Sequence, residues 1–247
     1  MAGFEESSWA DTAFTDRFLE SADLQVVERR RMFALARSFY THFFGTSGGT
    51  RVLDLGCGDG ILTFELLKAG GVSEATLVDA SPEMLAKAGE RLSGFRNVRF
   101  IQSTFQDLLK GNGDLPRFDL VVSSLAIHHI PFGEKRLLFG KIYSLLDPGG
   151  FFLIIDGVLP PTVTLEEWYI ELWREWISEK GRELGRELNF DEFIFGHHQE
   201  KRHHDALDTL DDQLGAMRDI GFSDVDCIYK YGIFAIFCGK KEASGEK

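Results

Sequence analysis

Residues 51–60 have the sequence RVLDLGCGDG, a short apolar run that passes into a loop with glycine at every second position. Glycine is needed where the backbone takes a positive φ or where another group approaches closely, and three glycines in five residues exceed the needs of a simple turn. Apolar residues at helical spacing follow in residues 61–69. We therefore predict a strand, a ligand-binding loop and a helix whose first N–H groups face the ligand.

The loop lacks the residues that two common phosphate-binding loops require. The dinucleotide fingerprint G-x-G-x-x-G/A needs glycine or alanine where this chain has Ile61, and no Gly-Lys-Ser/Thr sequence follows the loop. Asp54 lies just before the loop instead, where a carboxylate disfavours phosphate and favours an ammonium or sulfonium group. The charge therefore predicts a cationic ligand.

A second acidic residue, Asp79, ends the apolar segment 75–78 and lies 21 residues after Gly58. In doubly wound folds, an acidic residue about 20 positions beyond the glycine loop accepts hydrogen bonds from the two hydroxyls of a ribose. We therefore predict that Asp79 binds a ribose.

Segments 52–60 and 77–79 together resemble the first two motifs of the class I S-adenosylmethionine-dependent methyltransferases. Segment 98–105 is similar to the third strand and adenine-contacting turn of that superfamily, with serine and threonine where Gly-Asp is common. Segment 118–129 resembles the fourth strand and its tail in small-molecule methyltransferases, and segment 145–155 resembles the turn into the fifth strand. The C-terminal region resembles carboxy-S-adenosylmethionine synthase more loosely.

The resemblance implies S-adenosyl-L-methionine as the cofactor and transfer of its methyl group to a small-molecule acceptor by in-line displacement. Such a transfer needs alignment of the reacting atoms and exclusion of water more than it needs a nucleophilic triad. Two alternatives stay open, namely an enzyme of the carboxy-S-adenosylmethionine synthase type that acts on the cofactor itself, and a non-catalytic module that binds the cofactor. The cofactor-binding residues implied are Asp54, Gly56, Cys57, Gly58, Asp79, Ala80, Met84, Thr104, Phe105 and Ser123.

An acceptor that is a hydroxyl or a protonated amine needs a base, and histidine is the side chain best suited to this role near neutral pH. His128 and His129 follow the predicted fourth strand. Adjacent residues of an extended chain face opposite ways, so we expect only one of them to face the ligand. We assign His128 as the catalytic candidate, with a structural role for both histidines as the alternative.

A second group of histidines contains His197, His198, His203 and His204, followed by Asp205. Their spacing matches no zinc motif, and charged residues surround them. We therefore expect solvated or interface histidines and no metal site, with contact to a substrate as the alternative.

Strands and helices alternate from residue 51 to 155, which predicts a parallel sheet with its ligand at the carboxyl ends of the strands. With the family resemblance, we expect an α/β fold, a Rossmann-like doubly wound sheet of seven mostly parallel strands. Its antiparallel last strand forms a hairpin at Gly232. N-terminal and inserted helices form a lid. The expected regions are a helical cap (1–48), the cofactor-binding core (49–158), the inserted lid (159–207) and the last helix with the hairpin (208–247).

Three helices outside the core have clear sequence signals. The cap is expected to hold one helix from about Leu24 to Phe44, and the last helix is expected to begin at Thr209 and end at Gly221. A capping box at Thr164 opens the lid helix. We expect its aromatic stripe to be core or interface, with substrate contact as the alternative; the stripe consists of Leu165, Trp168, Tyr169, Leu172, Trp176 and Ile177.

Composition limits the partners. A chain of 247 residues with 44% hydrophobic residues can form one domain with a full core, and its net charge of −12 disfavours free nucleic acid. The basic run at residues 29–31 is expected to be a solvated helix face, although one arginine could pair with the carboxylate of the methionyl group. Three cysteines cannot form a disulfide framework, and Cys57 is expected to fill a small buried space.

No run of 18 apolar residues is present and the N-terminus is mixed and acidic, which predicts neither a membrane span nor a signal peptide. We therefore expect a cytoplasmic protein, either a monomer or a homodimer, with a small-molecule substrate and no membrane partner.

Overall fold

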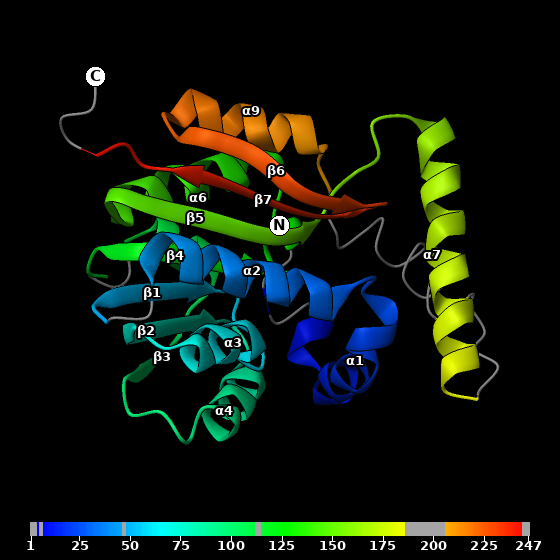
Figure 1. Ribbon diagram of the computed structural model, residues 1–247, viewed down its shortest axis with the longest axis horizontal. Helices are drawn as coiled ribbons and strands as arrows, with labels where there is room; N and C mark the ends of the chain where they lie inside the picture. Colours follow the sequence, from blue (N-terminus) through cyan, green and yellow to red (C-terminus); the bar gives the residue numbers. More distant parts are fainter. Residues whose placement is uncertain (1–3, 5–6, 46–47, 112–114, 186–205, 244–247) are drawn as a thin grey trace.

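The computed structural model describes residue 4 and residues 7–45, 48–111, 115–185 and 206–243. A seven-stranded sheet with the strand order β3-β2-β1-β4-β5-β7-β6 forms its centre, and helices cover both faces (Figure 1). The strands are β1 Thr50–Leu55, β2 Val72–Asp79, β3 Val98–Gln102, β4 Phe118–Ser124, β5 Leu146–Gly157, β6 Ser223–Tyr231 and β7 Phe234–Lys240.

The helices lie between the strands, before them and in one long insertion. Two short 3-10 segments are η2 Ser8–Ala10 and η3 Ile127–His129. The α-helices described are α1 Thr12–Gln25, α2 Arg29–Phe44, α3 Ile61–Ala69, α4 Pro82–Arg91, α5 Phe105–Leu109, α6 Phe132–Leu145, α7 Val163–Glu183 and α9 Leu210–Ile220.

Strands β1 to β5 pair in parallel, whereas β7 runs antiparallel between β5 and β6. This arrangement confirms the predicted sheet of seven mostly parallel strands with an antiparallel last strand. Because parallel strands point the same way, the carboxyl ends of β1, β2, β4 and β5 meet at one edge. The loops that follow these strands therefore share a single region of the molecule.

Alternate residues of the central strands pack into two hydrophobic layers. Leu53 and Phe152 face α6 and α9, whereas Val52 and Phe151 face α2, α3 and α7. Sheets that are buried on both faces have a fixed register, because a slip of one residue would exchange the two layers. The carboxyl edge of the sheet is therefore a rigid platform.

The N-terminal region contains two helices where the sequence analysis predicted one. Helix α1 begins after Asp11, whose carboxylate accepts a hydrogen bond from the N–H of Ala13, and it was missed. Helix α2 begins at Arg29 rather than near Leu24, because Glu28 adopts a left-handed conformation with φ of 55°. Hydrophobic periodicity runs through this break unchanged, so the sequence pattern alone did not reveal it.

Helix α7 corrects two details of the predicted lid helix. Its N-cap is Thr162, whose hydroxyl accepts a hydrogen bond from the N–H of Leu165, so the capping box at Thr164 was wrong. Trp173 and Ile177 form its buried face, whereas Trp168 of the predicted stripe is 55% exposed. The residue at which the helix begins and its packing against α1 together determine which of its side chains are buried.

Two indole groups join α7 to the end of α1. The N–H of Trp173 donates to the carbonyl of Gln25 at 2.8 Å, and the N–H of Trp176 donates to the carbonyl of Leu24 at 3.0 Å. These carbonyls lie in the last turn of a helix, where intrahelical donors are lacking. The two helices therefore form one unit beyond the right-hand end of the sheet in Figure 1, where the carboxyl ends of the strands lie.

The C-terminal elements agree with their sequence signals. Thr209 caps α9 by accepting the N–H of Asp212, and Gly221 ends the helix with φ of 110°. Gly232 turns the β6–β7 hairpin as predicted, with φ of 54°. Within the described residues, no helix has both the length and the apolar composition needed to cross a membrane.

A buried lysine fixes the segment that leads into α9. Lys135 of α6 is fully buried, and its ammonium group donates to the carbonyl of Ala206 and to the carboxylate of Asp208. The loss of one partner of a buried ion pair leaves an uncompensated charge. This contact therefore links α6 to the last part of the chain.

We predict that Lys135→Met lowers the free energy of unfolding by roughly 2 to 4 kcal/mol, because Asp208 and the Ala206 carbonyl lose their buried donor. Arg136→Met is the matched control, since Arg136 forms an exposed ion pair with Asp219 and should contribute less than about 0.5 kcal/mol. Urea denaturation measures both values. Equal effects of the two substitutions would contradict the prediction.

Candidate functional site

The glycine loop between β1 and α3 contains three residues with positive φ, namely Gly56 at 67°, Gly58 at 53° and Gly60 at 73°. A Cβ atom at Gly56 would lie 2.3 Å from the Cβ atom of Ala126, and one at Gly60 would lie 3.1 Å from that of Ala88. A Cβ atom at Gly58 would meet nothing within 4 Å. Gly56 and Gly60 therefore allow close packing, while Gly58 borders open space.

Asp79 at the end of β2 holds the loop in place. Its Oδ2 atom accepts the N–H of Gly58 at 2.8 Å, and its Oδ1 atom accepts the N–H of Ser81 at 2.9 Å. Burial raises the pKa of this carboxyl group. Each carboxylate oxygen has a second lone pair, so Asp79 can still accept a hydrogen bond from a ligand hydroxyl.

Asp54 is a deeply buried carboxylate of the site, with 1% of its surface exposed. Its Oδ2 atom accepts the hydroxyl of Thr63 at 2.6 Å, and no donor among the described residues reaches its Oδ1 atom. Burial, followed by the charges of Asp79 and Asp59, raises the pKa of Asp54 to about 7. A buried acceptor that lacks a donor is costly, and such groups occur at functional sites.

Two predicted cofactor residues use their hydroxyls within the protein. Ser123 is buried and donates to the carbonyl of Leu55 at 2.7 Å, which ties β4 to β1. Thr104 caps α5 by accepting the N–H of Asp107 at 3.1 Å and donating to its carboxylate at 2.8 Å. Both hydroxyls therefore bond within the protein, that of Ser123 between β4 and β1 and that of Thr104 at the start of α5.

The remaining predicted cofactor residues line or support the same edge. Phe105 starts α5, and its ring would lie 3.3 Å from a Cβ atom at Gly56. Cys57 and Met84 are buried, as expected for Cys57, and Ala80 precedes the N-cap residue of α4, Ser81. The glycine loop, β2 and α5 therefore meet at the carboxyl edge, as the sequence analysis expected.

The tail of β4 turns sharply toward the loop. Leu125 has φ of 54°, an unfavourable value for a leucine, and its N–H donates to the carbonyl of Ile155 at 2.8 Å. Such strain costs roughly 1 to 3 kcal/mol and persists where the surrounding structure fixes it. The turn places Ala126 against Gly56 and carries His128 and His129 to the same edge.

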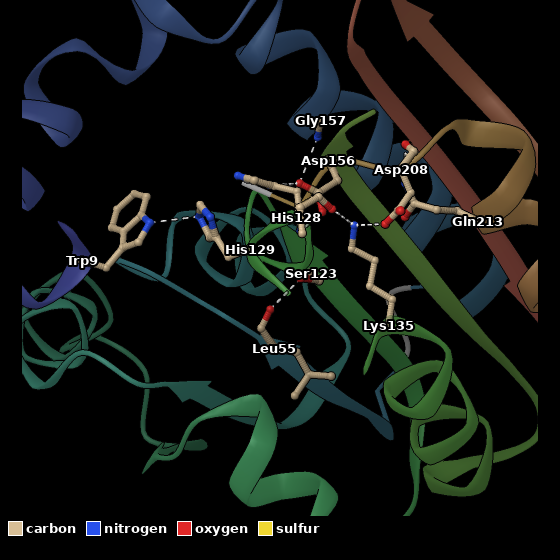
Figure 2. Close-up of polar contacts among 11 residues, drawn as sticks. Trp9, Leu55, Ser123, His128, His129, Lys135, Asp156, Gly157, Asp208 and Gln213 are labelled. Atoms are coloured by element: carbon tan, nitrogen blue, oxygen red, sulfur yellow. Dashed lines mark hydrogen bonds and ion pairs between the residues drawn. The ribbon is translucent and has the colours of Figure 1, made fainter. Parts of the chain in front are cut away.

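His128 contacts a buried acid that the sequence analysis did not identify. Asp156 of β5 accepts the backbone N–H of His128 at 3.0 Å, and its carboxylate also contacts the ring Nδ1 atom of His128 (Figure 2). Asp156 follows an apolar strand just as Asp79 does, so the same signal could have found it. An acidic residue at the end of an apolar strand was taken as a site residue only for β1 and β2, at Asp54 and Asp79.

His129 faces a different partner. The indole N–H of Trp9 donates to its Nε2 atom at 2.9 Å, and Figure 2 shows Trp9 on the side opposite to Asp156. The rings of Phe14 and Phe18 pack against Trp9 at 5.2 and 5.0 Å between centroids. The N-terminal segment therefore contacts the histidine pair from the side of α1.

Two other predicted features remain, the basic run at residues 29–31 and the second group of histidines. In the basic run, Arg30 has an 87% exposed side chain, whereas Arg29 is largely buried and pairs with Asp23 at 2.9 Å. His197, His198, His203, His204 and Asp205 lie outside the described residues. In the part of the chain that the structure describes, no group of three or more histidine, cysteine or acidic residues could hold a metal ion.

A family of methyltransferase domains matches residues 46–208, which is more than half of the chain. The chain belongs to the methyltransferase domain family. An uncharacterised methyltransferase of Synechocystis sp. (strain ATCC 27184 / PCC 6803 / Kazusa) is 35% identical over 112 residues, covering 44% of this chain and 48% of that protein. The chain thus aligns with about half the length of this relative.

Carboxy-S-adenosyl-L-methionine synthase of Chromohalobacter salexigens is 25% identical over 205 residues, covering 79% of this chain and 70% of that protein. Solved structures share the fold at lower identity. Human N-acetylserotonin methyltransferase in complex with S-adenosylmethionine has a TM-score of 0.62 and 19% identity, covering 95% of this chain and 58% of that chain. Magnesium protoporphyrin IX methyltransferase from Synechocystis PCC 6803 has a TM-score of 0.63 and 17% identity, covering 95% of this chain and 97% of that chain.

We predict that Asp54→Asn reduces the dependence of stability on pH. The pKa of about 7 in the folded state lies above the usual value of 3.8, so the folded chain keeps a proton that the unfolded chain releases. Stability therefore falls as pH rises from about 4 to 7. Between pH 5 and pH 8 the wild-type chain should lose roughly 2 to 3 kcal/mol more than the variant.

Urea denaturation of the ligand-free protein at the two pH values measures this difference. Asp226→Asn serves as the control, because Asp226 is exposed on β6 and should leave the pH dependence unchanged. An Asp54→Asn variant with the pH dependence of the wild type would refute the assignment.

Proposed function

We propose that this chain is an S-adenosyl-L-methionine-dependent methyltransferase that acts on a small-molecule acceptor. The observation that carries the proposal is the open space at Gly58, whose N–H donates to the carboxylate of Asp79, in the loop that follows Asp54 in a member of the methyltransferase domain family. Bare backbone next to two acidic groups suits a cationic ligand with a ribose better than it suits a phosphate.

The residues present fit this cofactor. Asp79 retains lone pairs for the ribose hydroxyls, and the Oδ1 atom of Asp54 is a buried acceptor that lacks a described donor. When bound, the cofactor supplies a methyl group that its sulfonium has already activated. The protein has to hold the acceptor in line with that methyl group and exclude water, which can contribute roughly 7 to 11 kcal/mol.

The acceptor is proposed to be a small molecule. The net charge of −12 works against a phosphate backbone, and two structural neighbours are named for N-acetylserotonin and magnesium protoporphyrin IX as acceptors. These names support the class of acceptor by analogy. On the acceptor side we assign His128 as the group that takes a proton, because it lies at the sheet edge that also carries the glycine loop.

A second candidate function follows from the length of one alignment. The carboxy-S-adenosylmethionine synthase relative aligns with 79% of this chain, compared with 44% for the Synechocystis relative. Under that function the product would be a modified cofactor rather than a methylated acceptor. Mass spectrometry of the nucleotide that copurifies with the protein separates the two functions.

We predict that Gly58→Ala keeps the fold but lowers the affinity for S-adenosyl-L-methionine by roughly tenfold or more, equivalent to about 1.4 kcal/mol. The added methyl group would meet no protein atom within 4 Å and would project into the open space where the cofactor is proposed to lie, while the positive φ of 53° makes alanine cost about 1 kcal/mol of stability there. Gly56→Ala, which clashes with Ala126, should instead lower thermal stability by several degrees. Titration calorimetry and thermal denaturation test the pair. A folded Gly58→Ala variant that binds S-adenosyl-L-methionine as tightly as the wild-type chain would exclude the proposed cofactor site at Gly58.

We predict that His128→Ala lowers turnover at saturating cofactor by about 100-fold or more, with cofactor affinity nearly unchanged. The assay first incubates the wild-type chain with labelled methyl donor and a metabolite extract, and the labelled product identifies the acceptor. His42→Ala is the control, because His42 is exposed on α2. Undiminished turnover in His128→Ala would remove His128 from the reaction. Absence of any labelled product despite tight cofactor binding would favour a non-catalytic module.

A further inference from the structure

Three aromatic side chains of the N-terminal region form a cluster that belongs to neither hydrophobic layer of the sheet. They are Trp9 of η2 and Phe14 and Phe18 of α1, and we call them the aromatic cluster. The ring centroids of Phe14 and Phe18 lie 5.2 and 5.0 Å from that of Trp9, with angles of 89° and 77° between the ring planes. Phe14 and Phe18 are four residues apart, so both rings project from one face of the helix.

Helix α1 packs on the rest of the protein without full burial of these rings. The buried residues of α1 are the smaller Thr15 and Ala22, whereas all three rings of the aromatic cluster keep part of their surface exposed. Other contacts hold the helix, since Asp16 pairs with Lys87 of α4 at 2.7 Å and two indoles of α7 bond to its last turn. Large apolar side chains that gather without being fully covered are typical of a binding surface.

The tail of β4 places the aromatic cluster beside the proposed cofactor site. Ala126 packs against Gly56 of the glycine loop. His129 follows three residues after Ala126, and its ring centroid lies 5.6 Å from that of Trp9. The indole N–H of Trp9 donates to the Nε2 atom of His129 at 2.9 Å, which fixes the orientation of the indole (Figure 2). A surface that is ordered before binding loses less entropy when a ligand binds.

Aromatic rings select ligands by charge distribution as well as by shape. Each ring has a negative face and a positive edge, so a second aromatic ring gains attraction beyond that of area burial. A cationic acceptor would also be attracted to the ring faces, but it would lie next to the positive sulfonium of the proposed cofactor and be repelled by it. An uncharged aromatic ring gains the attraction without this repulsion.

We propose that the aromatic cluster binds the methyl acceptor and that this acceptor carries an uncharged aromatic ring, which packs against Trp9, Phe14 and Phe18. This inference rests on the proposed methyltransferase function and specifies its acceptor class. The aromatic cluster selects the acceptor, whereas the glycine loop holds the donor. Loss of the rings therefore weakens acceptor binding and leaves cofactor binding unchanged.

Fluorine NMR of the full chain tests where an aromatic probe binds. The chain has four tryptophans, which are labelled as 5-fluorotryptophan, and Trp9→Phe and Trp168→Phe assign the two signals to be compared. With S-adenosyl-L-homocysteine in place of the donor, 2-naphthol should shift the Trp9 signal at least about three times as far as the signal of Trp168, which is 55% exposed on α7. Equal shifts of the two signals overturn the proposed location.

A saturated probe tests the aromatic class of the acceptor. The wild-type chain should bind 2-naphthol about fivefold or more tightly than decahydro-2-naphthol, because each aromatic pair adds roughly two- to tenfold in affinity. Equal affinities for the two probes overturn the aromatic class.

Removal of two rings tests the role of the cluster. A variant with both Phe14→Leu and Phe18→Leu should lose the preference for 2-naphthol, while its dissociation constant for S-adenosyl-L-methionine changes less than about twofold. Phe43→Leu is the matched control, since Phe43 is 49% exposed on α2 and packs against Phe151. A folded double variant that keeps the preference overturns the inference, and the two wild-type measurements test it even where the double variant does not fold.

The labelled product gives an independent measurement. When the wild-type chain is incubated with labelled methyl donor and a metabolite extract, the labelled product should contain an aromatic ring. A labelled product without an aromatic ring overturns the acceptor class. Failure of the wild-type chain to bind S-adenosyl-L-methionine in calorimetry would instead refute the proposed function, whatever probe the aromatic cluster binds.

Discussion

The close approach of the β4 tail to the glycine loop determines how the rest of the site is arranged. Gly56 leaves no room for a side chain because Ala126 lies where its Cβ atom would be. This contact brings the loop after β1 and the histidines after β4 to one edge of a rigid sheet. The proposed cofactor site and the proposed proton acceptor are therefore positioned by backbone packing as well as by polar contacts.

The site holds several groups that lower stability. Asp54 is a buried acid with an oxygen that lacks a described donor, Leu125 has a left-handed backbone, and Asp156 is buried beneath His128. Proteins retain such features where function requires them and offset the cost elsewhere. In this fold the offset comes from strands packed on both faces, including β4 and β5, whose central residues are nearly all buried.

The sheet and the identity of the cofactor were predicted correctly because their signals are local. Asp54, the glycines and Asp79 lie within 26 consecutive residues, and their spacing reflects one strand-loop-helix-strand unit. The buried face of α7 and the break at Glu28 were not predicted, because both depend on how α1 and α7 meet. Periodicity identifies an amphipathic helix but not the neighbour that selects its buried face.

The proposed acceptor side depends on contacts between residues far apart in the chain. Trp9 and His129 are 120 positions apart, His128 and Asp156 are 28 apart, and Trp173 reaches Gln25 across 148 positions. No local pattern encodes such pairs, so Asp156 became visible as a partner of His128 only when the topology placed the ends of β4 and β5 together. Because the cofactor side is local and the acceptor side is not, substitutions in the N-terminal segment and α7 can alter the acceptor region while the glycine loop stays intact. Chains with this core can therefore differ in acceptor while retaining one donor.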